Sequence, residues 1–319
     1  MLRLTPDRLT LVAPALPDTA RGGSIAIGNF DGVHLGHQAV IEHARKPGLP
    51  LGVMTFEPHP RAWFAAQRGV DLAPFRLMTS DTRALRLEKL GVDLLYELPF
   101  GPDLAALSPE EFVTAILIER LGAHHVAVGQ DFFFGRDRAG TADTLVEIGA
   151  KHGLMVTVAD MVHTGPTEVS STNIRLALTE GRPGDAAQML GHWHRITGPV
   201  VHGEKRGREL GYPTANMSLH NLHAPAYGVY AVTVDVLDGP HRGTYGGAAS
   251  IGTRPMFGDN EHNCETFLFD FTGDLYGATL SVGLVAFLRG EENFDSLDEL
   301  IAQMEKDCAQ ARTILADTP

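Results

Sequence analysis

The sequence predicts an α/β domain built on a parallel sheet, followed by a mainly antiparallel β-barrel domain with a closing α-helix. Up to about residue 182, buried-strand runs alternate with helical segments, which is typical of a parallel sheet with helices on both faces. From residue 183 onward, short apolar runs are separated by glycines, which favours antiparallel strands. A length of 319 residues fits two domains, 1–182 and 183–319, with one large domain as the alternative.

Composition and charge narrow the class of protein. Hydrophobic residues make up 44% and charged residues 20% of the chain, which is ordinary for a soluble globular protein. A formal net charge of −13 argues against a nucleic-acid partner, because such a surface needs a dense basic patch. Cys264 and Cys308 stand in no metal-binding spacing, and neither a secretory pattern nor an apolar run of ~18 residues is visible. We therefore expect a reduced, cytoplasmic protein without a membrane partner, and its oligomeric state stays open.

A strand, a tight turn and a helix start are predicted within residues 25–37, IAIGNFDGVHLGH. A helix start presents unpaired N–H groups and a positive dipole end, and glycines let the backbone approach a phosphate closely. His34 and His37 are three apart, so their rings share one face of a helical turn and can donate hydrogen bonds to a phosphoryl group. A solvated turn with two incidental histidines is the alternative. The agreement of strand, glycines, histidines and helix favours a nucleotide site.

Further strands and helices complete this half. A buried strand over 49–56 ends at two prolines that flank His59. His59 either joins the nucleotide pocket at the carboxyl end of the sheet or lies on the surface, and both interpretations stay open. Ser108 begins a helix with a capping box. The other predicted elements are helices over 79–90, 108–121 and 144–151 and strands over 92–98, 125–129 and 154–159.

Two loops in this half carry candidate binding residues. Residues 132–134 are three phenylalanines beside glycines, which suit either a wall for a flat ring or a packed loop. Hydroxyl residues over 170–172 cap a later helix start, and Arg175 adds a planar fork that can hold nucleotide phosphates. This motif alone is weak evidence for a nucleotide site. It is stronger because the same α/β sheet carries the histidine turn, residues 28–37 with His34 and His37.

The second half has the composition of a small β-domain with a final helix. Strand composition recurs over 197–202, 228–237, 245–251, 265–271 and 280–288, after a short helix that ends near Leu190. Ser296 and Glu299 form a capping box for the last helix. An apolar stripe at helical spacing predicts core packing along it, through Leu297, Leu300, Ile301, Met304, Cys308, Ala311 and Leu315.

A basic loop and a polar pair precede the central strands of this half. The glycine-rich segment 203–211 can wrap phosphates with N–H groups and charges, or it is a solvated hairpin tip. Thr214 and Asn216 are two apart in extended chain, so they point to one side. Their oxygens can then serve a hard cation such as Mg²⁺.

Glu265 is a carboxylate in an apolar strand. By alternation it is predicted to point with Phe267, Phe269 and Phe271. A carboxylate on an apolar face is costly unless it has a task or a partner. An edge position exposed to water is the alternative.

Taken together, these motifs closely resemble the bacterial family of bifunctional riboflavin kinase/FMN adenylyltransferases, or FAD synthetases, over essentially the whole chain. The last helix of the family resembles 294–312 here, and Met256 stands where the family usually has threonine. The matching motifs are GNFDGVHLGH (28–37), FEPHP (56–60), GQDFFFG (129–135), SSTNIR (170–175) and GRELGYPTAN (207–216).

The resemblance implies a Rossmann-like nucleotidyltransferase domain and a riboflavin kinase barrel, with ATP as co-substrate. Riboflavin's 5′-hydroxyl would attack the γ-phosphate of ATP, with Glu265 as base and Mg²⁺ held partly by Thr214 and Asn216. The phosphate of FMN would then attack the α-phosphate of a second ATP, which gives FAD and pyrophosphate without a covalent intermediate. The residues implied in charge stabilisation of this second step are His34, His37 and Arg175.

The resemblance also implies a set of ligand-binding positions and leaves two competing functions. The positions are Gly28, Phe30, Asp31, Gly36, His59, Asp131, Ser170, Ser171, Thr172, Gly203, Lys205, Gly207, Arg208, Gly211 and Pro213. One alternative is a regulatory flavin-binding second half, but a mere binder needs no base such as Glu265. The other is adenylylation of another small phosphate, as in coenzyme A or NAD synthesis, which the kinase-like second half argues against.

Overall fold

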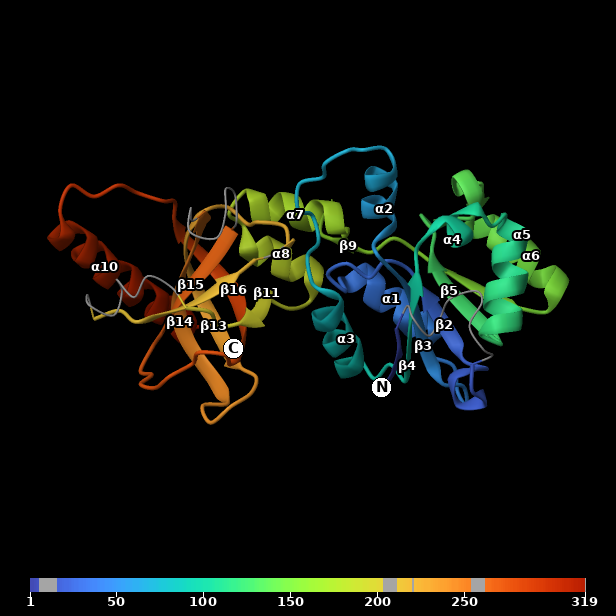
Figure 1. Ribbon diagram of the computed structural model, residues 1–319, viewed down its shortest axis with the longest axis horizontal. Coiled ribbons are helices and arrows are strands. Elements are labelled where there is room, and N and C mark those ends of the chain that lie inside the picture. The colour runs from blue at the N-terminus through green and yellow to red at the C-terminus, as the bar shows by residue number, and fades with distance from the viewer. Residues whose placement is uncertain (6–15, 203–210, 220, 254–261, 319) are drawn as a thin grey trace. The chain divides into compact units, whose positions relative to one another are not determined.

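The computed structural model describes residues 1–5, 16–202, 211–219, 221–253 and 262–318, and their contacts divide the chain into two compact units (Figure 1). The first unit comprises Met1–Leu72 and Thr79–Ser170. The second comprises Ala73–Met78 and Ser171–Pro319, so a short segment from the first half of the chain belongs to it. The domain boundary between residues 182 and 183 stays a prediction.

A six-stranded parallel sheet forms the centre of the first unit, which confirms the predicted α/β class. Its strands β2 and β3 are almost wholly buried, as expected of a sheet covered on both faces. The edge strand β1 was not predicted, because three residues carry too little pattern. The strand order is β1 (Leu2–Leu4), β4 (Leu94–Pro99), β3 (Leu51–Glu57), β2 (Ser24–Ile27), β5 (His125–Gly129) and β8 (Met155–Ala159).

Helices pack on this sheet from two sides. Helix α1 (Leu35–Ala44) contacts β2, β3, β5 and β8. Helix α5 (Pro109–Glu111) continues into a π-helical segment, Phe112–Arg120, which shares an apolar core with α6 (Ala142–His152) and with Ile25 and Ile27 of β2. The remaining elements are α2 (Pro60–Gln67), α3 (Ser80–Lys89), α4 (Pro102–Ala106), short 3₁₀ turns at Asp18–Ala20 and Arg136–Arg138, and the hairpin strands β6 (Phe133–Phe134), β7 (Gly140–Thr141), β9 (His163–Thr164) and β10 (Thr167–Glu168).

A curled antiparallel sheet forms the second unit, which confirms the predicted barrel-like class. Beyond β11, Val201 N donates to Asn216 O of β12 at 2.9 Å, so the two ends of the strand order meet. Apolar side chains such as Val232, Cys264 and Val282 fill its interior. The strand order is β11 (His194–Pro199), β16 (Thr279–Arg289), β13 (Gly228–Val236), β14 (Gly243–Thr253), β15 (His262–Leu268) and β12 (Thr214–Ser218).

Three helices among the described residues complete the second unit. Helices α7 (Ser171–Thr179) and α8 (Pro183–Leu190) pack on each other, and α8 also contacts β11 and β16. Helix α10 (Leu297–Ala316) lies on the outer face against β13, β14 and β16. The apolar stripe along α10 was predicted to be core, which is right for buried Ala311 but wrong for Leu297, which is 56% exposed. The reason is that α10 joins only through its second half the outer apolar cluster, whose buried members are Ala231, Ala248, Phe269 and Ala311.

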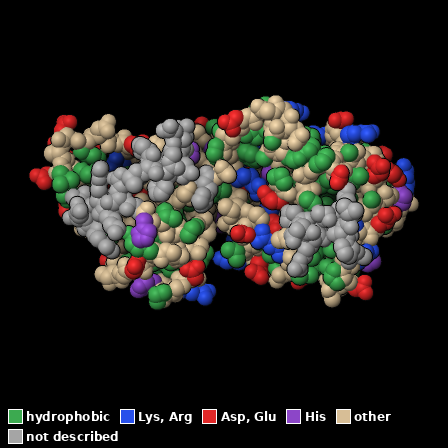
Figure 2. Space-filling view, in the orientation of Figure 1, with side chains coloured by type: hydrophobic (Ala, Val, Ile, Leu, Met, Phe, Trp, Pro, Cys, Tyr) green, Lys and Arg blue, Asp and Glu red, His purple; other side chains and the backbone are tan. Residues whose placement is uncertain are grey.

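Acidic and basic side chains are interspersed over the visible face of each unit (Figure 2). Among the described residues, no helix is both long enough and apolar enough to cross a membrane.

Candidate active sites

The histidine pair lies where β2 turns into α1. His34 is the N-cap of α1, and its Nδ1 accepts a hydrogen bond from the His37 backbone N–H at 3.2 Å. The two rings stack with their centroids 3.6 Å apart and their planes at 19°, so they share one face as predicted. A Cβ at Gly36 would come within 3.1 Å of the His34 ring, which explains the glycine between the histidines. Because Nδ1 of His34 is an acceptor, its neutral ring carries the proton on Nε2.

The turn before the helix is strained. Phe30 (φ 51°) and Val33 (φ 45°) adopt the left-handed conformation although neither is glycine, and both side chains are fully buried. Each such residue costs of order ~1–3 kcal/mol and persists only where its surroundings hold it. Here Gly28 N donates to Met54 O at 3.1 Å, and the Gln38 amide donates to Val33 O at 2.9 Å. The turn is therefore held in one geometry before any ligand arrives.

The electrostatics of the turn favour a neutral His37. Burial, the neighbouring His34 and the positive charge of Arg83 hold the pKa of His37 well below its usual range. The Phe30 ring lies 5.1 Å from the His37 ring, and the Asp31 side chain is buried beside them in the turn. A neutral imidazole carries one N–H donor, which can stabilise a developing negative charge without a protonation step.

Arg83 is a site residue that the sequence reasoning missed. Its guanidinium is fully buried behind the turn and donates to Glu57 at 2.9 Å and to Glu97 at 2.8 Å. Burial alone would raise the pKa of Glu97, but hydrogen bonds from Arg3, Ser80 and Arg83 outweigh it and lower that pKa. The signal was present in the sequence, because Arg83 stands four residues before Leu87 on the buried face of α3.

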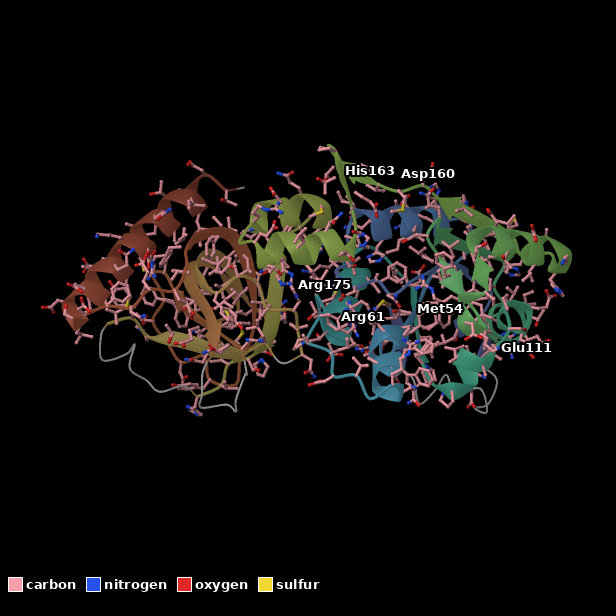
Figure 3. The ribbon with its side chains drawn as sticks, turned by 90° about the horizontal axis from the view of Figure 1, so that it is seen from above. Met54, Arg61, Glu111, Asp160, His163 and Arg175 are labelled. Atoms are coloured by element: carbon pink, nitrogen blue, oxygen red, sulfur yellow. The ribbon has the colours of Figure 1, made fainter. Side chains whose placement is uncertain are left out.

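Two further predicted residues follow the carboxyl ends of strands next to β2. His59 comes after β3 and caps α2, where its Nδ1 accepts from Arg61 N at 3.1 Å; Figure 3 labels Arg61 on this helix. Asp131 comes after β5 and is exposed, with its Oδ1 over Gly129, where a Cβ would lie 2.8 Å from it. Ligands of open parallel sheets gather at this edge.

The three consecutive phenylalanines divide between the two interpretations that the sequence left open. Phe134 is buried, and Phe132 stacks on it with ring centroids 5.5 Å apart, so these two form a packed loop. Phe133 is 46% exposed, and the Arg138 guanidinium lies 4.6 Å from its ring centroid.

An aromatic cluster that the sequence reasoning did not single out lies at the same edge of the sheet. The rings of Trp63 and Phe64 of α2 each lie 5.6 Å from that of Phe100, just after β4, and Phe56 at the end of β3 lies 5.9 Å from it. Phe64 is 39% exposed. An exposed aromatic face of this kind can stack on a flat ring.

The serine-rich motif spans the division between the units. Half-buried Ser170 ends the first unit, whereas Ser171 and Thr172 open α7 of the second. Arg175 of α7, labelled in Figure 3, donates through Nε to Phe75 O at 2.7 Å, and its guanidinium lies 5.7 Å from the Phe75 ring centroid. All of these contacts are within the second unit, so a role for Arg175 at the histidine turn stays a prediction.

The second candidate site lies on the outer face of β12 and β15. Asn216 pairs directly with Glu265 in the antiparallel register, and Thr214 pairs with Phe267. Asn263 donates to Glu265 Oε1 at 3.1 Å. Asn216 donates to Thr214 O at 3.2 Å, yet its own side-chain oxygen is buried and has no hydrogen-bond partner among the described residues. A buried amide oxygen in this state is suited to a hard cation.

The prediction that Glu265 points with three phenylalanines is correct for two of them and wrong for Phe271. Along β15, Cys264 and Leu268 point into the barrel, so half-buried Glu265 and Phe267 point outward. Phe269 joins the same outer cluster, but Phe271 packs against the interior core. Strict alternation fails because the strand ends at Leu268 and Asp270 follows in the left-handed conformation (φ 56°).

The basic loop lies outside the described residues for the most part. Gly203, Lys205, Gly207 and Arg208 are in this segment, as is Met256 in a later one, so their roles stay predictions. Gly211 and Pro213 are described and exposed at the entrance to β12, and Gly211 has the left-handed φ of 85°. Among the described residues, no group of three or more His, Cys, Asp or Glu side chains forms a metal site.

Comparisons with known proteins cover both units. A family model described as FAD synthetase matches residues 16–173, and one described as riboflavin kinase matches residues 190–315. A bifunctional riboflavin kinase/FMN adenylyltransferase of Pseudomonas fluorescens is 42% identical over 301 residues, which cover 93% of this chain and 94% of that protein. The protein of the same name from Escherichia coli K12 is 40% identical over 295 residues, covering 91% and 92%.

A solved structure resembles the chain over nearly its full length. It is that of a Streptococcus pneumoniae protein described as a macrolide-efflux protein, with a TM-score of 0.80, 32% sequence identity and coverage of 96% of each chain. The likeness therefore extends through both the parallel-sheet unit and the antiparallel unit.

Proposed function

Because this chain belongs to the family of bifunctional riboflavin kinase/FMN adenylyltransferases, we propose that its two described sites each carry one of the family's two reactions. The enzyme phosphorylates riboflavin to FMN with ATP and adenylylates FMN with a second ATP to give FAD and pyrophosphate. Its substrates and products include riboflavin, FMN, FAD and ATP.

The histidine turn is proposed as the adenylyl-transfer site, and the stacked His34–His37 pair carries this proposal. Phosphoryl chemistry depends mainly on positioning and charge stabilisation, so neutral imidazole donors at a helix start suit the α-phosphate of ATP. Gly28 and Gly36 would let the backbone approach the nucleotide, and Asp31 is proposed to lie beside it. Phe30, His59, Asp131 and Ser170 of the same unit are proposed to line the same ligand, and the roles of Ser171, Thr172 and Arg175 stay predictions from the family resemblance.

The flavin ring is proposed to stack on the aromatic cluster of α2 and the loop after β4. Trp63, Phe64 and Phe100 lie at the carboxyl edge of the sheet, as does the histidine turn, and Phe64 is exposed. Adenylylation needs the phosphate of FMN near the α-phosphate of ATP, and stacking would hold the remote end of FMN during that encounter.

The outer face of β12 and β15 is proposed as the kinase site. Glu265 would accept the proton of riboflavin's 5′-hydroxyl, and Thr214 and Asn216 would hold Mg²⁺, which neutralises charge on the transferred phosphoryl group when bound. The Asn216 side-chain oxygen, which lacks a hydrogen-bond partner within the part of the chain that the structure describes, supports this assignment. The loop residues Gly203, Lys205, Gly207 and Arg208, with Gly211 and Pro213 after them, are proposed to surround the phosphates of ATP.

A cytoplasmic location and a Mg²⁺ requirement are part of the proposal. Cys264 and Cys308 are free thiols, as suits a reducing compartment.

Incubation with riboflavin, ATP and Mg²⁺, followed by chromatography of the products, tests the assignment. We expect FMN and FAD to form with Mg²⁺ and neither to form in EDTA. Product formation that is indifferent to EDTA would refute the metal assignment, and absence of both products under all conditions would refute the function.

A further inference from the structure

Arg83 of α3 belongs to neither set of proposed catalytic groups, yet it is fully buried directly behind the histidine turn. Its Nη2 donates to Glu57 at 2.9 Å and to Glu97 at 2.8 Å. Its Nη1 lies 3.5 Å from the carbonyl oxygen of Asn29, at the first residue of the turn proper. A charge buried to this extent is retained only where several partners compensate for its desolvation.

The Asn29 carbonyl oxygen is the atom through which the turn contacts both α3 and β3. A second donor, Thr55 Oγ1 of β3, reaches the same oxygen at 3.1 Å. The next residue, Phe30, is the first left-handed residue of the strained turn. Rotation of the peptide after Asn29 would therefore move the strained residues and, beyond them, the His34 cap of α1.

Glu97, which holds Arg83, has partners of its own. It accepts from Ser80 Oγ at 2.6 Å and from Arg3 Nε at 2.6 Å, so Ser80 still holds this carboxylate when Arg3 is replaced. Arg3 comes from β1 at the sheet edge and also pairs with Asp81. Arg3 thus shares the Glu97 partner of Arg83, and among the described residues its side chain bonds to Glu97, Asp81 and Ser80 and not to the turn.

We propose that Arg83 is a positioning residue for adenylyl transfer, which holds the histidine turn in its reactive geometry through the Asn29 carbonyl. The proposal rests on the assignment of adenylyl transfer to this turn. A planar guanidinium can contact Asn29, Glu57 and Glu97 at once, whereas an ammonium group at the same place lacks this fixed fork.

The effect of the Arg83 charge on the pKa of His37 gives a second, independent way to test the proposal. Its positive charge helps to hold the pKa of His37 low, after burial and the neighbouring His34. The described titratable and charged groups around the turn include His34 at the start of α1, Asp31 in the turn, Arg83 on α3, Glu57 at the end of β3 and Glu97 on β4. A variant without the Arg83 charge keeps the nearby carboxylates, which favour a protonated imidazole, so the pKa of His37 should rise. The acid limb of the adenylylation rate should then move to higher pH.

The test compares Arg83→Met and Arg83→Lys in the full-length enzyme, with steady-state kinetics of both half-reactions over pH. For Arg83→Met we expect kcat of FMN adenylylation to fall ~10–100-fold, with an acid limb displaced upward in pH. For Arg83→Lys we expect about a tenfold fall in kcat with the acid limb unmoved, because the charge remains while the fork is lost. Riboflavin phosphorylation should stay within about threefold of wild type in both variants.

Arg3→Met is the matched control, because it removes a cation from Glu97 without touching Asn29. It should leave adenylylation within about threefold of wild type and the acid limb in place. The proposal is overturned if Arg83→Lys retains the wild-type kcat, if both half-reactions fall together, or if Arg3→Met is as damaging. If Arg83→Met does not fold, Arg83→Lys decides alone. His37→Ala in the same series tests the assignment of adenylyl transfer to the histidine turn separately from the role of Arg83. Full adenylylation in that variant would refute the assignment.

Discussion

Glu265→Gln is the sharpest test of the kinase site, because it removes proton acceptance while it leaves the local structure intact. Asn263 donates to Glu265 Oε1 at 3.1 Å, and the amide oxygen of glutamine can accept the same hydrogen bond. The strand pairing with Asn216 is made by the backbone and is unaffected. We therefore expect the variant to fold and to bind riboflavin as the wild type does.

The expected loss is that of a positioned general base. Such a group contributes ~10²–10⁴ in rate, which corresponds to roughly 3–5 kcal/mol of activation free energy. Initial rates of riboflavin phosphorylation and of FMN adenylylation are measured on one purified sample. The first should fall by this factor, and the second should stay within about twofold, because adenylylation is assigned to the other unit.

Asp270→Asn is the matched control for this experiment. Asp270 lies two residues beyond β15, is exposed, and pairs with Arg312 of α10 at 2.7 and 2.9 Å. The same carboxylate-to-amide change there should leave both rates unchanged. A kinase rate within a few-fold of wild type in Glu265→Gln would remove Glu265 as the base, and an equal loss of both reactions would indicate misfolding.

Three further outcomes are expected. His37→Ala should lower FMN adenylylation by ~10²–10³ while riboflavin phosphorylation persists, measured as separate initial rates; an unchanged adenylylation rate would remove His37 from the site. The buried carboxylate of Asp307 accepts a hydrogen bond from Arg289 at 2.8 Å, and Arg289→Met removes this charge partner. The variant should therefore destabilise the second unit by about 3–5 kcal/mol in urea unfolding. An unchanged unfolding midpoint would contradict this. Burial lowers the pKa of His125 to about 4, so the unfolded state binds the extra proton and stability should fall as pH drops from about 6.5 to 4. His125→Asn should flatten that dependence in thermal melts, and an identical slope would refute it.

Several site features are local in sequence, and for these the amino-acid sequence was sufficient. The three-residue spacing of His34 and His37 places both rings on one face of any helical turn, and the structure has them stacked. The two-residue spacing of Thr214 and Asn216 likewise places both on one face of any strand. The α/β and β-barrel classes followed from hydrophobic periodicity, which is also local.

Other features depended on partners far away in the chain, and only the tertiary structure decided them. The pairing of Asn216 with Glu265 is a matter of strand register, which neither strand specifies alone. Phe271 lies on the interior side because β15 ends at Leu268, an end that alternation does not encode. Arg83 of α3 is buried because Glu57 of β3 and Glu97 of β4 compensate its charge. Leu297 is exposed because α10 packs on the sheet only through its second half. Periodicity states which side chains share a face, whereas the free energy of burying each one depends on what the rest of the chain places against it.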